Sequence, residues 1–191
     1  MTGDNDIQGR VAAVLSGHPE HFDPLVRQFE KPLFNFVLNR VRDMELARDL
    51  TQEAFLKAYT ALPSWDSKQA SFRTWLYRIG LNLALDHFRR QRTRQETQKS
   101  FEREAVLAAA AATPADRLAE RDQMLRLLSR LDREDADMLL MRFVDDLTYD
   151  EIAVVTGMGT TTLRSRVHRA IRKLQDYLDV PARSEVKVHG V

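Results

Sequence analysis

The stretch Leu147–Leu174, LTYDEIAVVTGMGTTTLRSRVHRAIRKL, decides the fold of the C-terminal part of this chain. Thr148 and Glu151 have the spacing of a capping box, which satisfies free backbone amides at the start of a helix. Gly157 marks a turn, and the segment Thr160–Lys173 contains five Arg or Lys residues, one His and no acid. The pattern predicts a helix, a turn and a second, cationic helix.

The second helix has two different faces. Its apolar residues fall within about 100° of one another on a helical wheel; they are Leu163, Val167, Ala170, Ile171 and Leu174. The opposite side carries Arg164, Ser165, His168, Arg169 and Arg172. A helix that is buried on one side and cationic on the other is what a helix-turn-helix places in the DNA major groove. The sequence therefore predicts DNA binding.

The composition agrees with a folded, DNA-binding protein. The chain has 191 residues, 43% of them hydrophobic, and a net charge of +1 that hides local asymmetry. His87–Arg94 is cationic, whereas acids gather at Asp43–Glu53, Asp132–Asp137 and Asp145–Glu151; such segregation suits one surface for DNA and others for proteins. The chain has no cysteine, which excludes disulfides and thiolate metal sites and fits a reducing compartment. It also lacks an apolar run of about 20 residues and a signal-peptide pattern, so we expect a cytoplasmic protein.

Helical spacing dominates the whole chain, and no strand-like alternation is evident. We expect an all-α fold of two small helical domains joined by a flexible linker, the C-terminal one a helix-turn-helix domain. The first domain is predicted to contain a helix that runs to Val41, with Asp23 as its N-cap and Pro24 at its first position. Helices are also predicted at Met44–Leu62 and Phe72–Arg92, the latter with Ser71 or Ser67 as a cap. The second is predicted to contain Asp116–Leu131, Asp135–Val144 and the helix-turn-helix. The predicted boundaries are a polar lead-in with one helical turn at 1–21, domains at 22–94 and 114–180, a linker at 95–113 and a tail at 181–191.

The helix that begins at Phe72 carries a second nucleic-acid signal. Trp75, Arg78, Asn82 and Arg89 form one stripe, while two apolar stripes flank it. Aromatic, cationic and amide groups together suit single-stranded DNA, in which bases stack and phosphates need cations. The alternative is that Trp75 belongs to the core and the arginines form a solvated face.

The helix Met44–Leu62 indicates a different partner. Asp49, Gln52, Glu53 and Leu56 form an acidic and amide-rich stripe with one apolar residue. Such a stripe suits a basic helix of a protein better than it suits DNA. The alternative is an ordinary solvated helix face.

Three segments, in this order and spacing, resemble the extracytoplasmic-function group of bacterial RNA polymerase sigma factors over about residues 22–178. They are ARDLTQEAFLKAY at 47–59, SFRTWLYRIGLNLALDHFRRQ at 71–91 and the helix-turn-helix stretch at 147–174. The resemblance implies a first domain that binds core polymerase and reads the −10 element as it melts. It also implies a second domain that docks its last helix in the major groove of the −35 element.

The resemblance also assigns roles to individual residues. Asp49, Gln52 and Glu53, with Leu56 beside them, match positions that meet a coiled coil on the largest polymerase subunit. The loop 63–71 matches the segment that captures a flipped base of the non-template strand. For the −10 element the implied residues are Lys68, Arg73, Trp75, Arg78, Asn82, Arg89 and Arg90. For the −35 element they are Thr161, Thr162, Arg164, Ser165, His168, Arg169 and Arg172.

Some positions depart from the family pattern, so promoter preference is not carried over. Thr161 stands where the family usually has glycine, Leu163 where it often has valine, and the loop SWDSKQAS is particular to this chain. The resemblance implies core RNA polymerase, promoter DNA and an anti-sigma protein, often membrane-anchored, as partners. It implies no cofactor, metal or catalytic residue, and a monomer when active.

Two other classes of protein compete with this interpretation. A helix-turn-helix repressor or activator explains 147–174, but it leaves the two first-domain stripes without a role and usually needs a dimer. A DNA-processing enzyme such as a recombinase would need a nucleophile among arginines or paired carboxylates holding a metal. No such set is evident, and His18 and His21, one helical turn apart, have no third ligand nearby.

Overall fold

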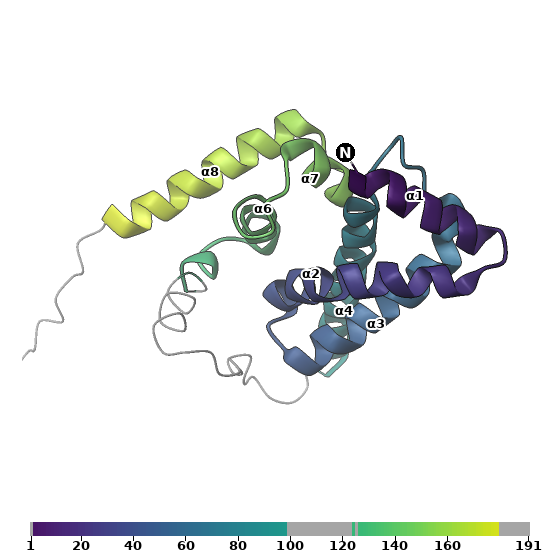
Figure 1. Cartoon of the computed structure of the whole chain (residues 1–191). Coiled ribbons are helices and arrows are strands. Elements are labelled where there is room, and N and C mark those ends of the chain that lie inside the picture. The colour runs from purple at the N-terminus through teal and green to yellow at the C-terminus, as the bar shows by residue number, and fades with distance from the viewer. Residues whose placement is uncertain (1, 99–123, 125, 180–191) are drawn as a thin grey trace, which may run out of the picture.

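The computed structural model describes residues 2–98, 124 and 126–179, and this part of the chain is helical without strands. The predicted all-α class is confirmed. Most of the expected linker, most of the expected helix Asp116–Leu131 and the tail 181–191 lie outside the described residues. The first domain consists of α1 Thr2–Leu15, η1 Pro19–Phe22, α2 Asp23–Val41, α3 Met44–Ala61, η2 Leu62–Ser64 and α4 Phe72–Gln98 (Figure 1).

Three helices build the core of the first domain. α2, α3 and α4 pack against one another in pairs. Their fully buried side chains include Leu25, Leu33, Phe36, Ala54, Phe72 and Leu76. α4 extends six residues beyond the predicted end at Arg92, to Gln98, so the first residues of the expected linker continue this helix.

Caps fix where these helices begin. The Asp43 carboxylate accepts a hydrogen bond from the Leu46 N–H at 3.0 Å and starts α3. Ser71, rather than Ser67, caps α4, because its hydroxyl accepts from the Thr74 N–H at 3.2 Å. The prediction that Asp23 is the N-cap of α2 is wrong by one residue. η1 leads directly into α2, so the cap position is Phe22 and Asp23 is already helical.

The expectation of a polar lead-in with a single helical turn is also wrong. Residues Thr2–Leu15 form α1, which lies against η1 and η2 (Figure 1). Ile7 and Val11, one turn apart, are buried in the core of the first domain. These two side chains, together with the half-buried Val14 that packs against the same core, dock the helix.

The second domain contains α6 Arg133–Phe143, α7 Tyr149–Thr156 and α8 Thr160–Asp179. Both halves of the predicted capping box are present between Thr148 and Glu151, and Gly157 ends α7 with a φ of 75°. Leu163, Val167 and Ala170 are buried, whereas Ile171 and Leu174 are half-buried. The helix-turn-helix predicted from the sequence is therefore confirmed.

Gly80 lies where α4 comes close to α2. A Cβ at this position would lie 3.0 Å from Leu33 Cδ1 and 3.4 Å from Val37 Cγ2. We expect Gly80→Val to lower the free energy of unfolding by about 1–3 kcal/mol, because the branched side chain overpacks this contact. Urea denaturation measures the loss. The control is Gly9→Val in α1, where a Cβ meets nothing within 4 Å; equal losses in both variants would contradict the prediction.

Candidate nucleic-acid interface

The outer face of α8 presents the predicted −35 residues to solvent. All seven of them, Thr161, Thr162, Arg164, Ser165, His168, Arg169 and Arg172, are exposed. The Arg164 guanidinium lies 5.5 Å from the centre of the Tyr149 ring, which holds it beside the start of α7. Within the described part of the chain, neither Arg164 nor Arg169 forms an ion pair. Both cations are therefore free to bind phosphate or a base edge.

Arg166 differs from the other arginines of α8. Its guanidinium lies 2.6 Å from Glu134 and 2.8 Å from Asp135, at the start of α6. The hydrogen bond to Glu134, followed by that to Asp135, raises the pKa of Arg166 despite partial desolvation. Lys173 adds a contact of 3.6 Å to Asp135. This acidic cluster thus holds α8 on α6, while the opposite cations face outward.

The stripe predicted to contact melted DNA lies on α4, where most of its residues are exposed and one is half-buried. Arg78, Asn82, Arg89 and Arg90 are exposed, and Arg89 pairs with Asp86 at 3.0 Å. Trp75 is half-buried, with its ring centre 5.6 Å from that of Phe72. The indole therefore belongs in part to the core, as the alternative interpretation expected, and offers only its outer part to a base.

Arg73 lies apart from this stripe. It is half-buried and directed toward the second domain, where its Nη2 lies 3.5 Å from the Asp145 carbonyl oxygen and 4.0 Å from Glu151 Oε1. Its guanidinium also lies 5.6 Å from the centre of the Tyr77 ring. In this conformation the cation predicted to bind −10 DNA is occupied by the other domain.

The loop after η2 is held in one shape by its own hydrogen bonds. The Asp66 carboxylate accepts from the Lys68 N–H at 2.9 Å and from the Gln69 amide at 3.1 Å, and these bonds lower the pKa of Asp66. Trp65 Nε1 donates to the Ala70 carbonyl at 3.2 Å. Lys68 is exposed on this loop.

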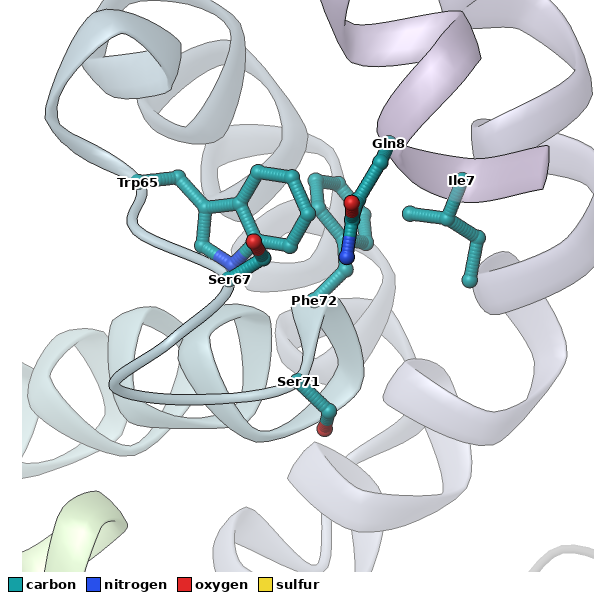
Figure 2. A pocket seen from close by; sticks show the side chains of 6 residues that line it. All are labelled: Ile7, Gln8, Trp65, Ser67, Ser71 and Phe72. Atoms are coloured by element: carbon teal, nitrogen blue, oxygen red, sulfur yellow. The ribbon is translucent and has the colours of Figure 1, made fainter. Parts of the chain in front are cut away.

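A small cavity of about 90 Å³ lies between the loop and α1. Figure 2 shows Gln8 reaching from α1 toward the loop; the lining residues are Ile7, Gln8, Trp65, Ser67, Ser71 and Phe72. Aromatic walls and uncharged polar groups suit a planar, hydrogen-bonding ligand such as a base. The sequence did not indicate Gln8, because α1 itself was not predicted.

A separate surface lies on α3. The predicted protein-binding residues Asp49, Gln52, Glu53 and Leu56 are all exposed on one face. Leu56 is 69% exposed, and Tyr59, three residues later, is 43% exposed. Glu53 pairs with Lys57 at 3.2 Å. Tyr59 was not predicted here, although its spacing from Leu56 places it on a neighbouring part of the helix surface.

The two domains are packed together through α4 and α7, with α2 and α6 beside them (Figure 1). At the centre is Arg40, whose side chain is fully buried and lies 3.0 Å from Asp145 and 3.9 Å from Asp137. Burial raises the pKa of both carboxyls, although Arg40 opposes the shift. The Arg133 guanidinium covers the Phe88 ring at 3.3 Å. Phe88 of α4 is thus covered by a residue of the second domain.

Among the described residues, no three His, Cys, Asp or Glu side chains gather as a metal site requires. His18 pairs with Glu20 at 3.4 Å. No helix of the described part combines the length and hydropathy of a membrane span.

Comparison with known families gives two matches along the chain. Residues 25–94 match the model of Sigma-70 region 2, and residues 121–174 match that of Sigma-70, region 4. The first match covers α2 to α4, including the α3 surface and the α4 stripe. The second covers the helix-turn-helix and the exposed cations of α8 up to Arg172.

Individual relatives span most of the chain. The RNA polymerase sigma-H factor of Pseudomonas aeruginosa is 31% identical over 89% of this chain and 92% of its own length. The ECF RNA polymerase sigma-E factor of Escherichia coli is 31% identical over 84% of this chain and 87% of its own. Among solved structures, CnrH in complex with the cytosolic domain of CnrY gives a TM-score of 0.66 at 26% identity, over 89% of this chain and 95% of that one. The sigma factor RpoE in complex with the anti-sigma factor NepR from Bartonella quintana gives a TM-score of 0.67 at 20% identity, over 83% of this chain and 97% of that one. This likeness supports the fold alone.

Proposed function

This chain belongs to the extracytoplasmic-function group of RNA polymerase sigma factors, and we propose that it directs core RNA polymerase to specific promoters. In this proposal residues 22–94 bind the core enzyme and the −10 element, and residues 114–180 bind the −35 element. The observation that carries it is the outer face of α8, where all seven predicted −35 positions are exposed while the opposite face is buried. The protein acts in the cytoplasm as a monomer, without a cofactor and without catalytic residues of its own.

At the −35 element, α8 enters the major groove of duplex DNA. Contacts to phosphates set the register of the helix, and contacts to base edges provide specificity. Arg164 and Arg169 have no ion pair within the described residues, so neither must break one before it binds. An arginine that binds guanine O6 and N7 together discriminates by about 1–3 kcal/mol.

At the −10 element, Arg78 and Asn82 face the melting strand, and Arg89 and Arg90 follow on the same helix. The loop that carries Lys68 captures a flipped base. The cavity beside Trp65 supports this role, because aromatic contacts and hydrogen bonds offset the unstacking energy of the base. Gln8 adds an amide that can donate to the base edge and accept from it.

The core enzyme binds the α3 surface, whose Asp49 and Glu53 suit a basic helix. A regulatory protein, an anti-sigma factor, completes the set of partners. The relative CnrH was solved with the cytosolic domain of CnrY, which supports a regulator of this chain that is anchored in the membrane.

Transcription with purified bacterial core polymerase and a fragmented bacterial DNA library tests the proposal. We expect discrete transcripts whose start sites share −35 and −10 sequences. A chain that fails to bind core polymerase, but binds duplex DNA as a dimer, would be a regulator of another kind and would overturn the proposal.

Arg164 provides a test of the −35 contact. We expect Arg164→Ala to reduce initiation at promoters that contain the −35 element by about 5- to 150-fold, the equivalent of 1–3 kcal/mol. The control is Arg126→Ala, which removes the same charge from an exposed position outside α8. Run-off transcription measures both, and an equal loss at promoters without the element would refute the assignment.

A further inference from the structure

We propose that the contact between α4 and α7 is an autoinhibitory latch, in which Glu151 of the second domain occupies Arg73 and competes with promoter DNA for it. The interdomain latch consists of Arg40, Arg73, Asp145 and Glu151. Its role in DNA competition rests on the proposed function, whereas the closed arrangement of the domains rests on the structure alone.

Glu151 connects the two domains through its two carboxylate oxygens. Oε2 accepts hydrogen bonds from the Thr148 N–H and hydroxyl, both at 2.9 Å, and so completes the capping box of α7. Oε1 accepts from the Thr74 hydroxyl at 3.3 Å and lies 4.0 Å from Arg73 Nη2. The capping box fixes the carboxylate in position, so an anion is held beside Arg73 where a phosphate oxygen would otherwise bind.

Arg40 contributes both a stabilising and a destabilising contact to the closed form. Its fully buried guanidinium is paired with Asp145 at 3.0 Å across the domains and donates to the Phe36 carbonyl at 2.6 Å within its own helix. Its Nε, however, has no hydrogen-bond partner among the described residues. A buried charge needs its pair and all its hydrogen bonds to offset desolvation. Closure therefore pairs Arg40 with Asp145 and, at a longer distance, with Asp137, whereas the Nε without a hydrogen bond opposes the closed form.

Closure leaves the two DNA-binding surfaces in different states. The predicted −35 residues of α8 are exposed in the closed form, whereas Arg73 is engaged by the second domain. A phosphate and Glu151 cannot both take the same face of Arg73, so closure and −10 binding are linked and each weakens the other. The free chain should thus be able to bind −35 duplex while resisting −10 strand binding.

The absence of cysteine in the sequence makes the domain separation directly measurable. Glu30→Cys on α2 and Gln175→Cys on α8 place a fluorophore on exposed positions of each domain of the full chain. In this background Glu151→Gln keeps the capping box, which accepts glutamine, and removes the charge beside Arg73. Asp145→Asn removes the charge beside Arg40. The matched control is Asp150→Asn, an exposed neighbour in α7.

Energy transfer should be high in the parent and in the Asp150→Asn control, and should fall in both latch variants. The two latch variants should also bind a fluorescein-labelled oligothymidine more tightly. The expected gain in affinity is on the order of tenfold when about nine-tenths of the parent molecules are in the closed form. Adding Arg73→Ala should abolish that gain. Equal energy transfer in all four proteins, or low transfer in the parent, would overturn the latch.

Transcription with core polymerase, run in parallel, separates this proposal from the proposed function. Transcripts together with unchanged energy transfer would leave the sigma factor role intact and reject the latch. Domain opening without any core binding or transcripts would reject the function, and with it the competition for DNA, while the closed contact would stand as structural.

Discussion

Replacing both Asp49 and Glu53 with alanine is expected to weaken binding of this chain to core RNA polymerase by about 30-fold or more. We expect both carboxylates to be buried in the complex, where removing one partner of a buried, hydrogen-bonded charge pair costs about 2–5 kcal/mol, and 1.4 kcal/mol is a factor of ten. Both side chains are exposed on α3. Titration of labelled chain with core polymerase measures the affinity, and binding to isolated −35 duplex should stay unchanged.

The matched control is the pair Glu30→Ala and Asp150→Ala. It changes the net charge by the same amount at exposed positions on α2 and α7. A general electrostatic attraction between chain and polymerase would weaken equally in both double variants. If core affinity stayed the same in the α3 variant, the assignment of this surface would be wrong.

The exposed apolar residues of α3 sharpen this prediction. Leu56 and Tyr59 stand next to the acidic positions and are 69% and 43% exposed. An interface typically surrounds a few apolar anchors with charged groups that set orientation and rate of association. We therefore expect the two apolar side chains to lie at the centre of the contact, with the acids buried beside them and setting the orientation of the partner.

The helix-turn-helix could be predicted from the sequence because every signal there is local. Thr148 and Glu151 form a capping box within one turn, Gly157 takes the left-handed conformation that ends α7, and Leu163 and Val167 repeat at helical spacing. None of these features depends on the rest of the chain. The same holds for the exposed side of α3, whose buried face is defined by spacing alone.

The sequence was less informative where contacts are made between distant segments. α1 was missed because its few core contacts, made by Ile7, Val11 and Val14, lie amid polar residues and Gly9. Helical spacing left Arg166 off the cationic face of its helix but did not identify its partners, and Arg73 was assigned to the −10 element only by the resemblance. Arg73 meets Glu151 of the other domain and Arg166 meets the acids of α6; periodicity carries no information about such long-range charge pairs.

Leu163→Ala is expected to unfold the second domain selectively. Leu163 is fully buried at the start of α8, and within the described part of the chain this helix packs mainly against α6 and α7. Truncating a buried leucine costs about 2–5 kcal/mol, because it removes apolar burial and leaves a cavity. Small domains are stable by roughly 0.05–0.15 kcal/mol per residue, so this loss removes much or all of the stability of the helix-turn-helix.

Circular dichroism should then show a loss of helix and a lower unfolding temperature for part of the chain, and −35 duplex binding should be lost. Core binding through α3 should persist, because the first domain has its own core around Phe36 and Leu76. Leu178→Ala is the control: this residue lies on the same helix, is 60% exposed, and should change stability by no more than about 0.5 kcal/mol. A simultaneous loss of core binding in Leu163→Ala would mean that the first domain needs the packed second domain in order to fold, and that the two form one cooperative unit.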